Sequence, residues 1–567
     1  MQEPIISFKD YTYHYRSQAE PTIHNINLEI NKGERIIIVG PSGCGKSTLA
    51  HCLNGLNPFS YPGESTGSLT ICGIEAGKAG IFELSQFVGT VLQDTDGQFI
   101  GMTVLEDIAF SMENDCVPQE EMIKRTHAEA EKVSLVEKLE AAPHELSGGQ
   151  KQRVSMAGVM INKVPVLLFD EPLANLDPAA GRDAIELIDH LQKDGEKTVV
   201  IIEHRLEDAM HMGADRIILM ENGRIINDSA PEDLFLSDKL IKAGIREPLY
   251  LTALKYAGIQ LSKDMHVERM QELSLNDSHK EQIRKWYEER RAKAPGKERP
   301  EVLRAEGIHF GYTPEKENLS DISFSIKEGE MVSIVGKNGA GKSTMAKLLC
   351  GFEKPGQGML YYQGRDMSGD TIKERAAHIG YVMQNPNQMI SKPMIFEEVA
   401  LSLTLQKLPE EEIKERVYET LKICGLYEFR NWPVNALSYG QKKRVTIASI
   451  LVAKPQILIL DEPTAGQDFR HYTEIMEFLK ELNEKGITVL MITHDMHLML
   501  EYTSRSLVFA DGKKIADTTP EALFADPELL KRASLKETSL YELAKRCGLP
   551  AENYIRAFIE YDREVRA

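Results

Sequence analysis

The hydrophobic positions of this chain fall into short, uninterrupted runs separated by longer polar stretches. Three short apolar runs are RIIIVG (35–40), VLLFD (166–170) and TVVIIE (198–203). Similar runs return later as MVSIVG (331–336), ILILD (457–461) and TVLMIT (488–493). Apolar runs of this length without alternation are typical of parallel strands buried on both faces. Helical stretches lie between them, so the pattern predicts α/β units with a parallel sheet covered by helices, and ligands at the carboxyl ends of the strands.

The two halves of the chain repeat one another. Three pairs of identical residues are each 291 residues apart: Gln93 and Gln384, Ser147 and Ser438, and Asp170 and Asp461. The end of each half also repeats, because PLYLTALKYAGI from Pro248 resembles SLYELAKRCGL from Ser539. Self-similarity of this extent indicates a duplicated domain. We therefore expect two copies of one domain, each ending in a helical appendage.

A strongly charged stretch without apolar periodicity separates the copies. Within it, Ser278 and Glu281 form the pattern of a capping box for a short helix that would stop at Pro295-Gly296. Mixed charge without an apolar face is typical of a solvated spacer with some helix. The sequence thus divides into three parts: 1–260, 261–302 and 303–567.

Composition narrows the class of protein. At 567 residues the chain is too long for one hydrophobic core, and 42% hydrophobic with 27% charged residues is ordinary for a folded protein. A net charge of -19 disfavours broad attraction to nucleic acid or anionic lipid. The seven cysteines form no CxxC pair, which favours a reducing compartment. No apolar run approaches the ~20 residues of a membrane span, and we expect no leader peptide.

A phosphate-binding pattern, GxxxxGK[ST], follows the first strand run of each copy. Consecutive backbone N–H groups of such a loop surround phosphate oxygens, the lysine neutralises the β and γ phosphates, and the hydroxyl holds Mg²⁺. A glycine-rich turn without a ligand is the alternative, but two matches in the same context disfavour it. The expected nucleotide-binding residues are Gly40, Pro41, Ser42, Gly43, Cys44, Gly45, Lys46, Ser47 and Thr48, and Gly336, Lys337, Asn338, Gly339, Ala340, Gly341, Lys342, Ser343 and Thr344.

Paired carboxylates end the second strand run of each copy, in the sequences VLLFDEP and ILILDEP. Asp170 and Asp461 are placed to reach Mg²⁺, and Glu171 and Glu462 to polarise an attacking water. Adjacent carboxylates at the end of a buried strand destabilise the fold unless a cation compensates, which disfavours a purely structural acidic pair.

Each copy contains, in the same order, the phosphate loop, a glutamine (Gln93, Gln384), LSGGQ or LSYGQ, the carboxylate pair, NLD or GQD, and a histidine (His204, His494). This set of motifs resembles that of the ATP-binding cassette ATPases, over nearly the whole chain outside the charged stretch. The resemblance implies two cassettes in tandem, each with a parallel-sheet core, a helical signature subdomain and the C-terminal appendage. It also implies ATP hydrolysis with ATP and Mg²⁺ as cofactors. The metal would be held by Ser47, Gln93 and Asp170 in the first copy and by Ser343, Gln384 and Asp461 in the second.

Further site residues follow from the resemblance alone. Gln93 and Gln384 resemble Q-loop residues near the metal and the attacking water, and His204 and His494 resemble the histidines that contact the γ-phosphate. Tyr15 and Tyr312 resemble the aromatic residue that stacks on adenine, although tyrosine is also common in ordinary strands. NLD (175–177) and GQD (466–468) resemble D-loops.

The signature motif differs between the copies, with LSGGQ at 146–150 and LSYGQ at 437–441. In the family two cassettes face each other head to tail, which we expect to occur within this one chain. Ser147, Gly148 and Gly149 would then complete the site of Lys342, and Ser438 and Gly440 that of Lys46. If Tyr439 needs positive φ or approaches the phosphate closely, it costs about 1–2 kcal/mol. We expect two working but unequal sites.

Cys44 lies inside the first phosphate loop. A thiol at a helix N-terminus has a lowered pKa, so we expect alkylation that inactivates the protein and is prevented by ATP. The alternative is a small residue that merely fits.

The segments that follow Gln93 and Gln384, and the appendages, resemble the ATPases of energy-coupling-factor importers. That resemblance implies a peripheral protein on the cytoplasmic face of the cell membrane. It would drive uptake of a vitamin, vitamin precursor or metal ion through separate partners, a transmembrane coupling protein and a substrate-binding membrane protein. QNPNQ stands only in the second copy, whereas the first has QDTDGQ.

Two alternatives remain from the sequence. A soluble tandem-cassette ATPase acting on ribosomes or nucleic acid has the same domain count, but the short, mixed-sign stretch between the copies and the overall acidity disfavour it. A sugar-importer ATPase usually has one impaired half, whereas both copies here carry the glutamate.

Overall fold

The computed structural model divides the chain into two compact units. Unit 1 comprises Met1–Trp286 with Asp468–Arg470, and unit 2 comprises Tyr287–Gln467 with His471–Ala567. We call the sheet-containing part of unit 1 the first cassette and that of unit 2 the second cassette. The structure describes residues 4–93, 96–174, 176–193, 197–290, 299–314, 316–464, 467 and 469–566, and describes only the backbone of Asp96 and Tyr439.

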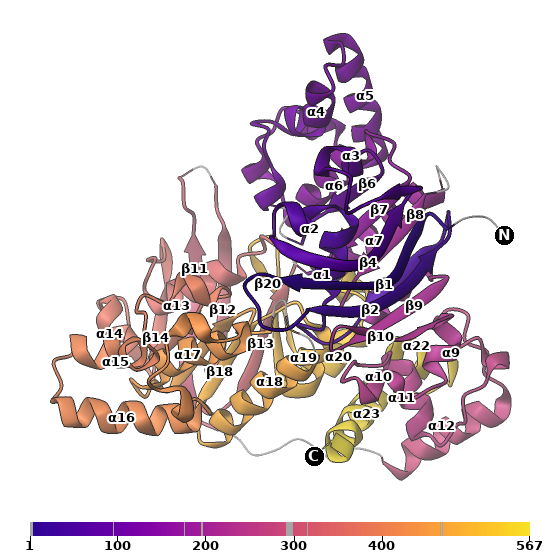
Figure 1. The fold of residues 1–567 in the computed structure, drawn as a ribbon. Coiled ribbons are helices and arrows are strands. Elements are labelled where there is room, and N and C mark those ends of the chain that lie inside the picture. Colours follow the sequence, from indigo (N-terminus) through magenta and orange to yellow (C-terminus); the bar gives the residue numbers. More distant parts are fainter. Residues whose placement is uncertain are drawn as a thin grey trace. The chain divides into compact units, whose positions relative to one another are not determined.

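Unit 1 contains two sheets (Figure 1). The larger has the order β10-β9-β3-β8-β7-β6, in which all neighbours are parallel except β10 and β9. Its strands are β3 (Arg35–Val39), β6 (Val88–Val91), β7 (Val166–Asp170), β8 (Thr198–Ile202), β9 (Arg216–Glu221) and β10 (Arg224–Ser229). The smaller sheet is antiparallel, in the order β2-β1-β4-β5, and consists of β1 (Ile6–Tyr15), β2 (Ile23–Ile30), β4 (Gly63–Ile71) and β5 (Ile74–Glu75).

Unit 2 has the same topology. Its larger sheet runs β20-β19-β13-β18-β17-β16, with only β20 antiparallel to its neighbour. Its strands are β13 (Met331–Gly336), β16 (Ile379–Val382), β17 (Ile457–Asp461), β18 (Thr488–Ile492), β19 (Arg505–Ala510) and β20 (Lys513–Thr518). The antiparallel sheet consists of β11 (Glu301–Phe310), β12 (Leu319–Lys327), β14 (Gln357–Tyr362) and β15 (Arg365–Asp366). The duplicated cassettes with a parallel core and all six predicted strand runs are thereby confirmed.

Helices connect the strands of each unit, in a similar order in the two units. In unit 1 they are α1 (Lys46–Leu53), α2 (Leu56–Phe59), α3 (Ile81–Ser85), α4 (Val104–Asn114), α5 (Gln119–Lys132), α6 (Gly148–Met160), α7 (Pro178–Lys193), α8 (Leu206–Ala209), α9 (Pro231–Phe235), α10 (Lys239–Lys242), α11 (Leu249–Tyr256) and α12 (Asp277–Glu289). In unit 2 they are α13 (Lys342–Cys350), α14 (Ile372–Ala376), α15 (Ile395–Leu405), α16 (Glu410–Ile423), α17 (Tyr439–Leu451), α18 (Phe469–Glu484), α19 (Met496–Tyr502), α20 (Pro520–Phe524), α21 (Pro527–Arg532), α22 (Ser539–Arg546) and α23 (Ala551–Arg566). Helices α4, α5 and α6 pack on one another as the helical subdomain of unit 1, and α15, α16 and α17 do so in unit 2. Helices α9 to α11 and α20 to α23 belong to the expected appendages, whereas α12 lies in the predicted spacer.

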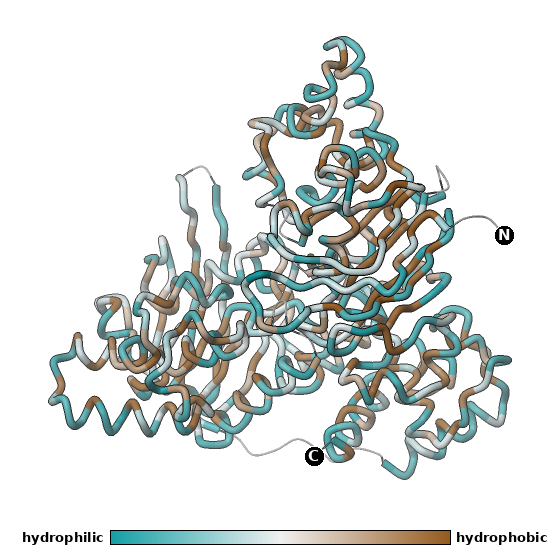
Figure 2. The backbone as a smooth tube through the Cα atoms, viewed as in Figure 1, coloured by the Kyte–Doolittle hydropathy of each residue, from teal (hydrophilic) through white to brown (hydrophobic). Residues whose placement is uncertain are grey.

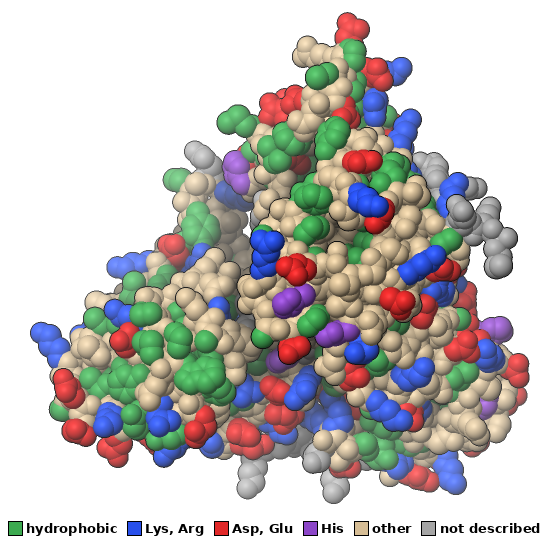
Figure 3. Space-filling model, in the orientation of Figure 1, with side chains coloured by type: hydrophobic (Ala, Val, Ile, Leu, Met, Phe, Trp, Pro, Cys, Tyr) green, Lys and Arg blue, Asp and Glu red, His purple; other side chains and the backbone are tan. Residues whose placement is uncertain are grey.

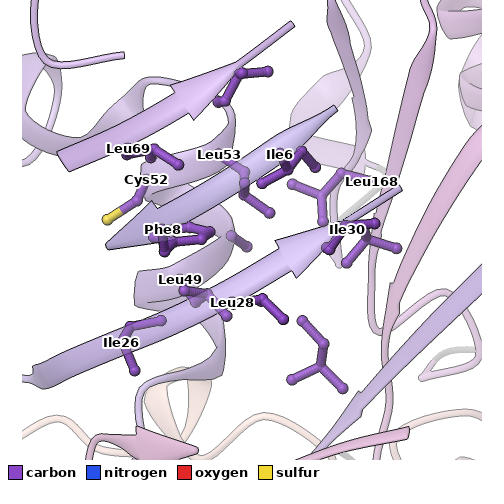
Figure 4. Close-up of a cluster of buried hydrophobic side chains, with 14 of the residues drawn as sticks. Ile6, Phe8, Ile26, Leu28, Ile30, Leu49, Cys52, Leu53, Leu69 and Leu168 are labelled. Carbon is purple, nitrogen blue, oxygen red and sulfur yellow. The ribbon is translucent and has the colours of Figure 1, made fainter. Parts of the chain in front are cut away.

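The antiparallel sheet was not predicted from the sequence, yet it supports the phosphate loop. In unit 1 its inward side chains, such as Phe8, Leu28 and Leu69, pack on Leu49 and Leu53 of α1 (Figure 4). Leu168 of β7 joins the same cluster from the parallel sheet. Figure 2 shows the hydrophobic residues concentrated along such strands. Helix α1 is therefore held by both sheets of its unit, which fixes the loop that precedes it.

The first part of the predicted spacer is folded rather than solvated. Side chains at seven of its positions are buried: Met265, Val267, Met270, Leu273, Ile283, Trp286 and Tyr287. The Tyr250 hydroxyl of α11 donates a hydrogen bond to the Val267 carbonyl at 2.7 Å. The predicted helix exists as α12, but its cap is Asn276, whose Oδ1 accepts from the His279 N–H at 2.8 Å, so the capping box expected at Ser278 was wrong. The expected stop at Pro295-Gly296 lies outside the described residues.

Candidate functional site

Both phosphate loops have the strand–loop–helix context that their sequence predicts. In the first, Lys46 begins α1, and its Nζ donates to the carbonyls of Gly40 and Pro41 at 2.8 and 2.9 Å. In the second, Lys342 begins α13, and its Nζ donates to the carbonyls of Gly336 and Lys337 at 2.7 and 3.0 Å. Each buried ammonium thus lies over its own loop, beside a helix N-terminus.

Glycine is required before each lysine. Gly45 and Gly341 have φ of 103° and 98°, and a Cβ on them would lie 2.6 Å from the Ile23 side chain and 2.4 Å from that of Leu319. A side chain there would be strained and would collide with the antiparallel sheet. The resulting bare loop, lysine and helix N-terminus are the donor set that a nucleotide phosphate requires.

The two carboxylate pairs have the same unusual backbone. Asp170 ends β7 and Asp461 ends β17, and the next residues, Glu171 and Glu462, have φ of 48° and 46°. The left-handed region costs a residue other than glycine about 1–2 kcal/mol. The N–H groups of both glutamates donate to the adjacent strand, at Ile202 and Ile492, over 2.9 Å. Equal strain at matching positions of both cassettes points to a functional requirement.

Burial shifts the aspartates toward their neutral forms. Burial and the neighbouring Glu171 raise the pKa of Asp170 to about 6, against the opposing charge of Lys46. Burial also raises the pKa of Asp461, although hydrogen bonds from Ser343 and Tyr381 oppose the shift. A bound divalent cation would favour the ionised form of both. The aspartates therefore have the chemistry expected of metal ligands.

The predicted glutamine, glutamate and histidine of the first cassette meet in space. They follow β6, β7 and β8, three neighbouring parallel strands whose carboxyl ends lie at one edge. Gln93 Nε2 donates to Glu171 Oε2 at 2.7 Å, and His204 Nε2 lies 3.0 Å from Glu171 Oε1. The glutamate is thus held from both sides at the edge where Lys46 lies.

The second cassette assembles the same residue types with a different arrangement. His494 presents Nδ1 instead of Nε2, and this atom lies 2.8 Å from Glu462 Oε1. Burial opposes ionisation of Glu462, but the charge and hydrogen bond of His494, and then the charge of Lys342, hold its pKa below the usual value. Gln384 follows β16, the counterpart of β6. The two catalytic edges are therefore similar but not identical.

The signature sequences are helix caps. Ser147 precedes α6, and its Oγ accepts from the Gln150 N–H at 3.4 Å while Gln150 Oε1 accepts from the Ser147 N–H at 2.9 Å. Ser438 and Gln441 form the same capping box before α17, at 3.3 and 3.0 Å. Tyr439 is the first residue of that helix, so it has ordinary helical backbone, and the cost expected for positive φ does not arise. Gly148 holds the equivalent position in α6.

The two predicted adenine-stacking tyrosines differ in their surroundings. The Tyr15 hydroxyl donates to Thr48 Oγ1 and accepts from Asn57 Nδ2, both at 3.2 Å, so it is tied to the phosphate-loop helix. Tyr312 is half-exposed and contacts Phe310 edge to face, with ring centroids 4.9 Å apart. Tyr312 is thus the more accessible aromatic surface.

Three further residues near the catalytic edges were missed from the sequence. They are Glu203, Tyr381 and Lys443, which stand where the other copy has Thr493, Thr90 and Gln152. Glu203 accepts from the N–H groups of Leu173, His204 and Arg205 at 2.8, 2.9 and 3.1 Å. Differences between the two copies at these positions were the available signal.

The D-loops and Cys44 are the remaining positions singled out in the sequence. Of the D-loops, Asn175, Gly466 and Asp468 lie outside the described residues, whereas Asp177 Oδ1 accepts from the Ala180 N–H at 2.9 Å at the start of α7. Cys44 is 4% exposed and lies two residues before α1. Its expected alkylation therefore requires local opening of the loop.

This arrangement defines a protein with two P-loop nucleotide-hydrolase cassettes. A family model described as ABC transporter matches residues 23–174 and 319–465, and one described as ATP-binding cassette cobalt transporter matches 237–310. The chain belongs to the ABC transporter family, as one of its ATP-hydrolysing ATP-binding proteins.

Similar proteins extend over the full length of the chain. An ABC transporter ATP-binding protein of Clostridium perfringens is 55% identical over 566 residues, with 100% of both chains covered. One of Enterococcus faecalis is 56% identical over 570 residues, again with 100% of both covered. A solved structure of cbiO1 from Clostridium perfringens, described as part of the ABC transporter complex cbiONQ, is 35% identical, covers 41% of this chain and 94% of that chain, and has a TM-score of 0.39.

Proposed function

We propose that this protein is the energy-coupling ATPase of an ABC-type importer that takes up a small solute through separate membrane subunits. The observation that carries the proposal is the match of residues 237–310, across the first appendage and α12, to a family model described as ATP-binding cassette cobalt transporter. It favours the metal-ion class among the vitamins, vitamin precursors and metal ions named above. The protein would lie on the cytoplasmic face of the cell membrane.

Membrane partners follow from the same proposal. Among the described residues, no helix is long and apolar enough to cross a membrane. After Gln93, Ile100 and Met102 are 64% and 82% exposed just before α4, where Thr103 forms a capping box with Glu106. Exposed apolar side chains on a rigid helix start suit contact with an apolar partner surface. We assign this segment to the transmembrane coupling protein; a substrate-binding membrane protein would complete the importer.

The nucleotide sites would form between cassettes placed head to tail within one chain. Ser147, Gly148 and Gly149 would complete the site of Lys342, and Ser438 and Gly440 that of Lys46. The N-termini of α6 and α17 present N–H groups and a positive dipole end, which favour a γ-phosphate. ATP binding would draw the cassettes together, and hydrolysis would release them.

Hydrolysis would use the residues at each catalytic edge. Glu171 or Glu462 accepts a proton from water as the water oxygen bonds to the γ-phosphorus, and the bond from that phosphorus to the bridging oxygen of ADP breaks. Gln93 and His204 orient Glu171, and His494 orients Glu462. Mg²⁺, when bound by Ser47, Gln93 and Asp170 or by Ser343, Gln384 and Asp461, would neutralise charge on the β and γ phosphates.

Affinity purification of the tagged chain from detergent-solubilised membranes tests the proposal. We expect integral membrane proteins to co-purify and, after reconstitution with them in proteoliposomes, ATP-dependent uptake of Co²⁺. Uptake should be lost in the Lys46→Ala, Lys342→Ala variant, the matched control. Exchange of Ile100 and Met102 for Asp should release the membrane proteins while leaving nucleotide binding intact.

Sedimentation with ribosomes, without recovery of membrane proteins, would overturn the proposal in favour of the soluble alternative. Acidic and basic side chains are interspersed on the face shown in Figure 3, which does not resemble the basic surface of a nucleic-acid-binding protein.

A further inference from the structure

The signature helices of the two cassettes differ at one buried position. Lys443 on α17 is 1% exposed, and Gln152 occupies the matching position of α6 at 3% exposed. Gln152 Nε2 donates to the Pro172 carbonyl at 2.5 Å, beyond the carboxylate pair of its own cassette. The lysine has a longer side chain and a charge, so it makes different contacts.

Lys443 joins three segments that are far apart in the sequence. Its Nζ donates to the carbonyls of Met383 and Gln384 in the Q-loop, the first at 3.3 Å, and lies 3.5 Å from the Glu462 carbonyl. An ammonium group has three N–H donors, which here face three carbonyl oxygens. The side chain thus ties the signature helix to the Q-loop and to the backbone of the glutamate.

The buried Lys443 ammonium depends on its hydrogen-bond partners. Burial lowers the pKa of Lys443 to about 8, while the negative charges of Asp461 and Glu462 oppose the shift. Hydrogen bonds to a charged group are stronger than those between neutral groups, and an unpaired buried charge is costly. Movement of the Q-loop away from Glu462 would therefore leave the ammonium without its partners.

We propose that Lys443 is a positioning residue, which sets the Q-loop of the second cassette against its catalytic glutamate. The proposal rests on the role of Glu462 proposed above. Among the described residues, the hydrogen bonds of Lys443 go to backbone oxygens, so it acts through Gln384 and Glu462. Among the hydrogen bonds of the described residues, the matching glutamine of the first cassette does not contact its Q-loop carbonyls, so this link between signature helix and Q-loop belongs to the second cassette.

Exchange of residues between the copies tests the proposal in the full chain. Lys443→Gln installs the side chain that the first cassette accommodates, and Lys443→Met removes all hydrogen bonding. We expect both variants to lower kcat for ATP hydrolysis about tenfold, since small misplacement of catalytic groups has large effects. KM for ATP and the Kd of a non-hydrolysable ATP analogue should stay within about twofold, because nucleotide contacts are unchanged.

Lys197 provides a matched control. It is buried like Lys443, its Nζ donates to the Val164 carbonyl near the opposite ends of the strands, and the second copy has Ile487 there. Lys197→Ile should lower the unfolding temperature while leaving kcat within about twofold. An equal loss of kcat in Lys197→Ile, an unchanged kcat in Lys443→Gln, or a rise in KM that accounts for the loss would overturn the proposal.

Glu462→Gln separates this inference from the proposed catalytic roles. We expect it to lower kcat at least as much as Lys443→Gln does. If Glu462→Gln is as active as the unaltered protein, the assignment of the glutamate fails. If Glu462→Gln is inactive and Lys443→Gln is fully active, the positioning role alone fails. If Lys443→Met does not fold, the kcat of Lys443→Gln still tests the positioning role of Lys443.

Discussion

The Tyr381 hydroxyl donates a hydrogen bond to Asp461 Oδ2 over 3.0 Å. Asp461 also receives a hydrogen bond from Ser343, so its carboxylate is held from two sides. In the first cassette Thr90 takes the place of Tyr381, and its buried hydroxyl has no partner within the described part of the chain. The aspartate proposed to bind Mg²⁺ in the second cassette is thus oriented by a residue that the first cassette lacks.

Removal of this hydroxyl should weaken metal binding. In Tyr381→Phe the Asp461 carboxylate loses a donor that fixes its orientation and lowers its pKa. Loss of such a supporting contact reduces metal affinity about tenfold or more. We expect the Mg²⁺ concentration that gives half-maximal ATPase activity to rise by about that factor. Thr90→Val is the matched control, and an equal shift in that variant would refute the assignment.

The two sites should contribute unequally to ATP hydrolysis. The site of Lys342 would receive the LSGGQ signature and contains Tyr381 and Lys443, whereas the site of Lys46 would receive LSYGQ. We expect Glu462→Gln to leave about threefold less residual ATPase activity than Glu171→Gln, a difference of under 1 kcal/mol in activation free energy. Steady-state assays at saturating ATP measure this. Equal residual activity would remove the case for asymmetry.

Glu203 should stabilise the first cassette through its three backbone partners. Burial raises the pKa of this carboxyl, with the charge of Arg205 opposing the shift. Glu203→Ala would leave the N–H groups of Leu173, His204 and Arg205 without their acceptor, and we expect a loss of about 3 kcal/mol. Thermal unfolding of the full chain measures the change.

The matched variant in the second cassette is Thr493→Ala. Thr493 Oγ1 accepts a single hydrogen bond, from the Asp495 N–H at 3.0 Å. Its removal should cost about 1 kcal/mol. Equal shifts of the unfolding transition in the two variants would contradict the part assigned to Glu203.

Thiol reactivity should follow burial. Burial raises the pKa of Cys52 to about 11 and of Cys350 and Cys424 to about 12, so the folded state holds these protons more tightly than the unfolded state. Their contribution to stability is complete below the unfolded thiol pKa of about 8.5–9 and is lost as pH rises above it. Cys116 is exposed.

Mass spectrometry after alkylation at pH 8 tests this order. We expect Cys116 to react first and Cys44 slowly, with ATP protecting Cys44, while Cys52, Cys350 and Cys424 react only after denaturant is added. Modification of these three in the native protein would contradict the burial. Cys116→Ser is the control for the fast phase.

Motif chemistry and strand patterns predicted much of this molecule. The run VLLFD became β7 residue for residue, and Gln93 and His204, which both came from the family resemblance, each lie within hydrogen-bonding distance of Glu171. The strands could be predicted because they depend on local apolar patterns, and the glutamine and histidine because their motifs resemble those of a known family.

Long-range side-chain contacts could not be predicted in this way. Lys443 lies 59 residues from Gln384 in the chain, and no periodicity relates the two. The spacing of Ser147 and Gln150 does signal a capping box. The signature was interpreted only as a phosphate-binding motif, so its role as a helix cap was missed. Residues 261–290 were misjudged because apolar positions such as Val267 and Ile283 are scattered along the sequence, yet their side chains are buried.

Fusion of both cassettes in one polypeptide has a consequence for the cell. Translation delivers the two halves in fixed stoichiometry, and neither can accumulate without the other. Once joined, each half is free to diverge while the pair is inherited together, which is how Glu203 can serve one half and Tyr381 the other. Any larger assembly that incorporates this chain therefore receives one first cassette and one second cassette.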